Sequence, residues 1–191
     1  ANGLDEKRLK RHMQELEKLQ KKYSSIRILK GSEVDILTNG QLDYSDSILK
    51  ELDIVIGSIH SGFKSDSKKM TQRITQALHN EYLTFMAHPT GRLINQRNPY
   101  DFDLDEILDV ARGQKKSMEI NSFPSRLDFE PNHIRACIER GIKLVINTDS
   151  HALQNMDFMQ YGIAQARRGW AKKEDIVNTL PLKKFEKMIA R

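Results

Sequence analysis

The sequence predicts an α/β protein built around a parallel sheet. Short apolar segments alternate with amphipathic segments about five times along the chain. Most of the apolar segments are continuous rather than alternating with polar residues, which is typical of strands buried on both faces. Polar residues that can bind metals or hydrogen-bond follow these segments. Helix-covered parallel strands occur in two architectures, an open doubly wound sheet and a β/α barrel, and the pattern fits both.

The chain begins with a predicted helix and a predicted strand. Residues 5–23 are expected to be helical because Leu9, Met13 and Leu16 recur at helical spacing among Lys, Arg and Glu. The charges of this helix fit an ordinary solvent-exposed face, so contact with nucleic acid is the less favoured interpretation. Residues 26–36 carry β-branched and apolar side chains and are predicted to form the first strand.

The next part of the chain contains a turn, a short helix, a strand and a longer helix. Asn39-Gly40 is a strong turn signal. Residues 45–52 are predicted to be a short helix, because serine near the start can cap it. Residues 54–60 are a continuous apolar run and are predicted to be the second strand. Residues 68–80 place their apolar side chains on one side and are predicted to be helical.

The same alternation continues to the C-terminal end. Further strands are predicted at 83–87, 117–121 and 144–148, and further helices at 103–111, 133–140, 157–168, 173–178 and 182–189. Gly113 and Gly141 follow two of these helices, where glycine commonly ends a helix. No low-complexity segment or linker divides the chain, so residues 1–191 are predicted to form a single domain.

Composition excludes several classes of protein. The 191 residues include 31 Lys and Arg and 26 Asp and Glu, a net charge of +5. This mild excess permits a polyanionic partner without demonstrating one. No run of about 18 apolar residues is present, so no membrane association is expected. Cys137 is the only cysteine, which excludes a disulfide framework and predicts a reducing, cytoplasmic setting. On the apolar side of its helix, Cys137 is expected to be a small core residue.

The polar residues at the strand ends predict a metal site. Glu33 lies near the end of the first strand, and the following strands end at His60, His88, Asn121 and Asp149, with His151 two positions further on. Successive members lie about one β/α unit apart. The carboxyl ends of parallel strands lie on one face, where β/α barrels build their active sites. Imidazole and carboxylate groups gathered there are suitable ligands for zinc, manganese or iron.

Each of these residues also has an ordinary structural interpretation. His60 or His88 alone is about as easily a hydrogen-bonded core histidine, and Asp149 could cap the following helix. The joint pattern favours metal binding by Glu33, His60, His88, Asp149 and His151. By contrast, His12, His79 and His133 fall on helices and are expected to be solvated or rim residues.

Basic and amide side chains near the predicted site favour a phosphorylated substrate. Arg92 and Arg126 fall in the loops that follow the third and fourth strands, where they are candidate phosphate clamps. Asn121 could hydrogen-bond a metal ligand or the substrate. Arg92, Asn121 and Arg126 are therefore the predicted substrate-binding residues, and no catalytic residue is predicted beyond the metal ligands.

The motifs together resemble the polymerase and histidinol phosphatase (PHP) family. The matching segments are Gly-Ser-Glu33-Val-Asp-Ile, Gly-Ser-Ile-His60-Ser, Ala-His88-Pro-Thr-Gly-Arg, Glu-Ile-Asn121-Ser and Asn-Thr-Asp149-Ser-His151-Ala. The chain is most similar to the C-terminal PHP domain of bacterial and archaeal family X DNA polymerases. The resemblance implies a distorted seven-stranded β/α barrel with up to three divalent metals, Mn or Zn, that hydrolyses phosphoesters. Within family X it implies a manganese-dependent 3′-5′ exonuclease.

The resemblance also implies a role for each ligand. Glu33 would bridge the first and second metals, and His60 and His88 would complete the protein ligands of the second. Asp149 would bind the first metal and His151 the third. The family's opening His-x-His motif is absent from this chain. We therefore expect the chain to lack about the first two β/α units and four metal ligands, and to bind fewer metals.

Three functions follow as alternatives. The favoured one is a DNA 3′-5′ exonuclease domain of a repair polymerase, with the DNA phosphate backbone and an upstream polymerase module as partners. The second is a stand-alone phosphatase acting on a small monoester such as histidinol phosphate. The third is a non-catalytic fragment that binds metal or DNA, because the His-x-His motif is absent. Unpaired sheet edges would favour association with another chain, including a homo-oligomer.

Overall fold

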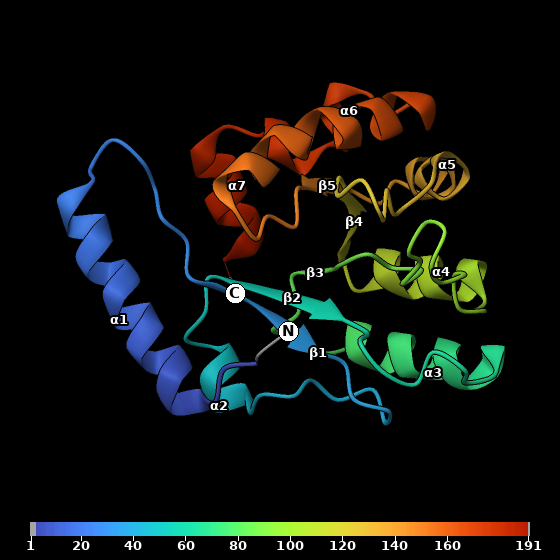
Figure 1. The fold of residues 1–191 in the computed structure, drawn as a ribbon, viewed down its shortest axis with the longest axis horizontal. Helices are drawn as coiled ribbons and strands as arrows, with labels where there is room; N and C mark the ends of the chain where they lie inside the picture. Colours follow the sequence, from blue (N-terminus) through green and yellow to red (C-terminus); the bar gives the residue numbers. More distant parts are fainter. Residues whose placement is uncertain (1–2, 191) are drawn as a thin grey trace.

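A parallel sheet organises the protein, whose computed structural model describes residues 3–190 (Figure 1). The strands of this part of the chain are β1 Gly31–Asp35, β2 Ile54–Ser58, β3 Phe85–Met86, β4 Ser117–Asn121 and β5 Leu144–Asn147. Every neighbouring pair is parallel, and the spatial order β1-β2-β3-β4-β5 repeats the order along the chain. A doubly wound sheet reverses its strand order at a switch point, and this sheet does not.

The winding is therefore that of a β/α barrel, and the predicted α/β class is confirmed. Within residues 3–190 the sheet is not closed, because β1 and β5 are its two edges. The fold is compatible with a PHP-type barrel in this open form. Figure 1 shows α3, α4 and α5 following one another along one side of the strands, as successive crossover helices of a barrel do.

Three of the α-helices in the described part of the chain, α1, α3 and α4, begin at an aspartate cap. The α-helices of the described part are α1 Glu6–Lys22, α2 Asp46–Leu49, α3 Ser67–Leu78, α4 Leu104–Gly113, α5 Pro131–Glu139, α6 Met159–Arg168 and α7 Leu182–Ile189. Short 3-10 helices cover Leu153–Phe158, Lys173–Asp175 and Val177–Thr179. The carboxylates of Asp5, Asp66 and Asp103 accept the backbone N–H three residues on, which satisfies donors that a helix start leaves free.

Four of the five predicted strands are shorter in the structure, and the first and third differ most. Residues 26–30 precede β1 in non-strand backbone, and the Ile28 N–H donates to the Gln20 side chain of α1 instead of to a strand. The predicted strand 83–87 keeps regular pairing only at 85–86. There the Thr84 hydroxyl, rather than a backbone carbonyl, accepts the Val55 N–H, and the left-handed backbone of His88 ends the strand.

The helix predicted at 173–178 is wrong as a single α-helix. Two 3-10 turns occupy 173–179, separated by Ile176 in extended backbone. Ile176 makes a parallel bridge with Leu144, and the Asn178 amide bonds both the N–H and the carbonyl of Ile146, at 2.7 and 2.9 Å. This segment covers the free edge of β5, a tertiary role that overrides local helical preference.

The predicted helix 157–168 also differs at its start. Its first two residues complete the 3-10 helix Leu153–Phe158, and regular α-helix begins only at Met159. This 3-10 turn directly follows the β5–α6 loop that carries Asp149 and His151.

Apolar side chains pack on both faces of the sheet. The larger cluster lies between the strands and the crossover helices and includes Ile74, Ile107 and Met118. A smaller cluster joins Phe85, Val145 and Val177. Adjacent strand residues face opposite sides, so Phe85 belongs to the small cluster and Met86 to the large one. The sheet is thus buried on both faces, as its continuous apolar strands predicted.

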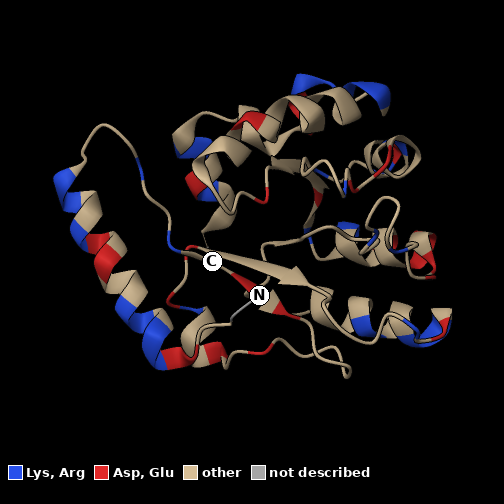
Figure 2. Cartoon of the chain, in the orientation of Figure 1, with Lys and Arg blue, Asp and Glu red and all other residues tan. Residues whose placement is uncertain are grey.

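Two further expectations concern burial and charge. Cys137 is fully buried in the larger cluster, as predicted, and burial raises the pKa of its thiol to about 12. Among the described residues, no helix has both the length and the apolar character needed to cross a membrane. Figure 2 shows Lys and Arg on helices and loops, whereas Asp and Glu also occur within the sheet, on β1.

Candidate metal centre

Three predicted ligands meet at the carboxyl ends of β1, β2 and β3. Glu33 projects from β1, His60 follows β2 by two residues, and His88 follows β3 by two residues. Glu33 Oε1 lies 2.9 Å from His88 Nε2 and 3.4 Å from His60 Nε2. One ligand atom from each residue lies within 4.8 Å of the other two. Within residues 3–190 this is the one group of three His, Cys, Asp or Glu side chains that converges in this way.

The donor set suits a divalent metal. Two imidazole nitrogens and one carboxylate oxygen are ligands that zinc and related ions bind, and three protein ligands leave positions open for water or substrate. The buried face of the group is formed by His88, which is 3% exposed, whereas the Glu33 side chain is 38% exposed. The arrangement is thus accessible from one side.

Charge also suits a cation at this position. Burial alone would raise the pKa of the Glu33 carboxyl, but hydrogen bonds and charge from His60 and His88 outweigh it and lower that pKa below its ordinary value. Glu33 is therefore an anion at neutral pH. The hydrogen bond to Glu33 raises the pKa of His60 against the opposing effect of burial, and a second bond to Asp35 adds to the rise. A metal ion at the centre would replace the hydrogen bond between His60 and this carboxylate.

The backbone of His88 is held in an unusual conformation. Its φ of 28° lies in the left-handed region, which non-glycine residues rarely adopt. The His88 N–H donates to Glu119 Oε2 at 2.6 Å, and the Glu119 side chain also accepts from Asn147 and Asn121. Burial raises the pKa of the Glu119 carboxyl, opposed by nearby His88 and these hydrogen bonds. Such strain at a strand end is common where a side chain must be aimed.

Asn121, Asp149 and Arg126 form a second group beside the first. The Asn121 amide donates to Glu119 at 3.1 Å and to Asp149 at 3.2 Å, and Arg126 Nε lies 3.3 Å from Asp149 Oδ2. Glu33, His88, Asn121 and Asp149 line one cavity of about 310 Å³. Two members of each group therefore line the same cavity, whereas His60 and Arg126 are not among its lining residues. Asp149 is not within ligand distance of the three converging residues.

His151 and Arg92 lie outside this cavity in the structure. The His151 side chain is 71% exposed, and its Nδ1 lies 2.7 Å from the Asp149 carbonyl oxygen. Arg92 donates to the carbonyls of Arg126 and Leu127 and to Glu130, so its guanidinium braces the loops after β3 and β4. Metal binding by His151 and phosphate binding by Arg92 remain predictions.

Several residues of the site are missed by sequence reasoning. Asp35 contacts His60, and Glu119, Asn147 and Asn178 line the cavity or support it. The sequence does contain a signal that could have identified two of these residues. Asp35 and Glu119 lie two residues from Glu33 and Asn121 on the same strands, and residues two apart face the same side of a sheet. The charged Glu119 inside an otherwise uncharged buried strand is itself informative.

The helical histidines behave differently from one another. His12 and His79 are exposed, as predicted for solvated residues. His133 is half-buried, with its ring 5.0 Å from that of Phe129 and its Nδ1 buried without a hydrogen-bond partner. Burial lowers the pKa of His133, so this histidine is better described as part of the protein interior than as a rim residue.

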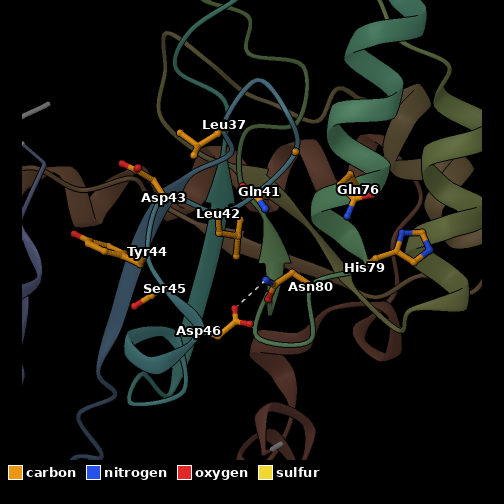
Figure 3. Close-up of a pocket in the computed structure, with 11 residues that line it drawn as sticks. Leu37, Gln41, Leu42, Asp43, Tyr44, Ser45, Asp46, Gln76, His79 and Asn80 are labelled. Atoms are coloured by element: carbon orange, nitrogen blue, oxygen red, sulfur yellow. Dashed lines mark hydrogen bonds between the residues drawn. The ribbon is translucent and has the colours of Figure 1, made fainter.

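A larger surface hollow of about 480 Å³ lies elsewhere and is distinct from the metal centre (Figure 3). It lies between residues 37–46 and the end of α3, where Asn80 donates to Asp46 at 3.5 Å. None of its lining residues belongs to the strand ends that carry Glu33, His60 and His88. The smaller cavity is the candidate functional site because of its chemistry and not its size, since it contains carboxylate and imidazole groups that could bind a metal.

The fold and the ligand group define a class of protein, an α/β protein compatible with a β/α barrel that gathers possible metal ligands at the carboxyl ends of its strands. The chain is 42% identical over all 191 residues to the C-terminal part of a DNA polymerase/3′-5′ exonuclease PolX of Bacillus subtilis. It is 29% identical over 174 residues to a probable phosphatase of Thermoanaerobacter sp., and 30% identical over 161 residues to one of Clostridium acetobutylicum.

These similarities confirm the resemblance to the PHP family, and within it to family X DNA polymerases. The matches cover 100%, 86% and 76% of this chain. The chain spans about a third of the length of PolX and 69% and 62% of the two probable phosphatases. No family model matches the chain.

Proposed function

We propose that this chain is a metal-dependent phosphoesterase domain that hydrolyses DNA phosphodiesters from the 3′ end, within a family X repair polymerase. The observation that carries the proposal is the convergence of Glu33, His60 and His88 at one end of the parallel sheet. The similarity to a PolX exonuclease over the whole chain supports DNA as the substrate and a polymerase module as the partner.

The residues of the site have separable roles in this proposal. Glu33, His60 and His88 would hold the divalent ion, which when bound neutralises phosphate oxygens and supplies a water of lowered pKa. Asp149 would contribute a further carboxylate ligand from the opposite wall of the shared cavity. Asn121 donates to Asp149 and thereby orients its carboxylate. Arg126 places a positive charge beside Asp149, where an anionic substrate would be attracted.

Loss of His60 tests the assignment. In the full-length protein with Mn²⁺, a 5′-labelled single strand should be shortened one nucleotide at a time from its 3′ end. His60→Ala should remove this activity, by at least about 100-fold, because a ligand is lost. His79→Ala is the matched control, since His79 is an exposed histidine at the end of α3, and it should retain activity. Full metal-dependent activity in His60→Ala would overturn the role of His60.

The second candidate is a phosphatase for a small monoester. The similarity to two probable phosphatases favours it, because one match covers 69% of that protein's length. The same preparation should be assayed with histidinol phosphate beside the oligonucleotide. A clear preference for the monoester would reverse the ranking. Metal binding without hydrolysis of either substrate would favour the non-catalytic alternative.

A further inference from the structure

Asp35 lies against the edge of His60 that faces away from the metal centre. Asp35 and Glu33 project from the same side of β1, two residues apart. The pairing of β1 with β2 sets Asp35 opposite Ser58, and His60 follows two residues later. Asp35 Oδ1 is hydrogen-bonded to His60 Nδ1, whereas His60 Nε2 lies 3.4 Å from Glu33 Oε1. The two nitrogens of one ring therefore face two different carboxylates.

This arrangement fixes which nitrogen can bind a metal. A neutral imidazole has one N–H donor and one lone pair, and a carboxylate can only accept. With the proton on Nδ1 and directed at Asp35, the lone pair of Nε2 faces Glu33 and His88. A carboxylate behind a metal-binding histidine orients the ring, selects the tautomer and increases the basicity of the ligand nitrogen.

We propose that Asp35 is a positioning residue that holds His60 in the orientation and tautomer required for metal binding through Nε2. The inference rests on the proposed metal centre and assigns a role to a residue outside the ligand set. Asp35 acts through His60 and does not itself touch the ion, because its carboxylate bonds the opposite edge of the ring. It is also absent from the convergent group of ligand atoms in residues 3–190.

The groups around Asp35 do not compete strongly for its hydrogen bond with His60. Arg73 is the nearby cation, but its guanidinium donates to the carbonyls of Ile36 and Ser61. Ser58 Oγ lies 3.4 Å from His60 Nδ1, a longer and weaker contact than the one from Asp35. In the part of the chain that the structure describes, the Asp35 carboxylate has no hydrogen-bond partner other than His60. Its position on an exposed strand edge means that substitution should not disturb the core.

The test measures Zn²⁺ affinity and the His60 tautomer in the full-length protein. Asp35→Ala should weaken binding at this site by about 10- to 100-fold, with the number of ions bound at saturation unchanged. Asp35→Asn should fall between Asp35→Ala and the unsubstituted protein, because its amide oxygen can still accept from Nδ1. Asp43→Ala is the control, since Asp43 is an exposed aspartate that follows the turn after β1, and it should leave the affinity unchanged.

Nitrogen NMR of His60 in the metal-free protein gives an independent result. At a pH high enough to keep the ring neutral, the Nδ1–H form should dominate when Asp35 is present, and Asp35→Ala should shift the ring towards the more common Nε2–H form. An unchanged affinity and tautomer in Asp35→Ala would overturn the proposal, and so would the loss of one bound ion, which would make Asp35 a ligand. If the unsubstituted protein binds no ion here, the proposed function fails, and the tautomer measurement alone decides the role of Asp35.

Discussion

His88 illustrates what single residues contribute to this site. Its position at a strand end could be predicted, because a polar residue that stops an apolar run before proline is visible in the sequence. Its left-handed φ of 28° and its bond to Glu119 could not, because both depend on which strands become neighbours. The same limit applies to Asp35 and His60, which are brought together by the pairing of β1 with β2. Residue types predict ligands better than they predict the groups that support ligands.

Glu119 should be important for stability as well as for the site. Both of its carboxylate oxygens accept hydrogen bonds in a fully buried position. Glu119→Gln would turn an amide donor towards one of these donors, and we expect it to lower the free energy of unfolding by about 1–3 kcal/mol. Urea denaturation measures the change. Glu139→Gln, at an exposed ion pair on α5, should cost less than about 0.5 kcal/mol. Equal effects of the two substitutions would contradict the role given to Glu119.

His133 should make stability depend on pH. Burial lowers its pKa in the folded state, so the folded protein binds a proton less readily than the unfolded chain. The contribution of neutral His133 to the free energy of unfolding is complete above the unfolded pKa of about 6.5. It is lost as the pH falls through the folded pKa. His133→Gln should flatten the acidic side of the curve of unfolding free energy against pH, whereas His79→Gln, at an exposed site, should not. Parallel curves of unfolding free energy against pH for the unsubstituted protein and His133→Gln would disprove this role of His133.

At the scale of elements, the succession of strands and helices was predictable and their lengths were not. The crossover helices α3 and α4 each have a polar cap, Asp66 and Asp103, and an apolar face that are visible in the sequence. The position at which a strand ends depends on the segments that it contacts in the folded protein. The Thr84 hydroxyl replaces a backbone acceptor, and residues 176–178 pair with β5 instead of remaining helical. Tertiary contacts therefore determine the lengths of these elements, and the local sequence pattern does not predict those contacts.

The close approach of α6 to the sheet is a testable feature of this arrangement. A Cβ at Gly162 would lie 2.0 Å from Ser122 Oγ and 2.5 Å from Ile146 Cγ2, so α6 contacts the ends of β4 and β5. Gly162→Ala should therefore lower the free energy of unfolding by about 1–3 kcal/mol despite the better helix propensity of alanine. Gly113→Ala at the end of α4 has no atom within 4 Å and should be neutral or stabilising by up to about 1 kcal/mol. Chemical denaturation of both variants checks the contrast, and a neutral Gly162→Ala would contradict the packing.

For the whole molecule, the open sheet brings together candidate metal ligands from distant parts of the chain. Glu33, His60 and His88 come from three strand ends, and β1, the strand that carries Glu33, is an edge strand within residues 3–190. The sequence predicted that these residues share one face because parallel strands end together. Which of them reach one another depends on the twist and register of the sheet. A ligand shared by three strands should therefore stabilise the fold and not only complete a site.

Metal binding should raise the melting temperature in a way that depends on His60. An ion that binds only the folded chain adds about 2.7 kcal/mol at a free concentration of 100 times its Kd, which for a chain of this length is roughly 5–11 °C. Thermal melts followed by circular dichroism with Mn²⁺ or Zn²⁺ should show this increase, and EDTA should reverse it. His60→Ala should show little increase, and His79→Ala should respond like the unsubstituted protein. An equal increase in His60→Ala would place the stabilising ion elsewhere, because the three converging side chains cannot hold an ion equally well after losing one of their two imidazoles.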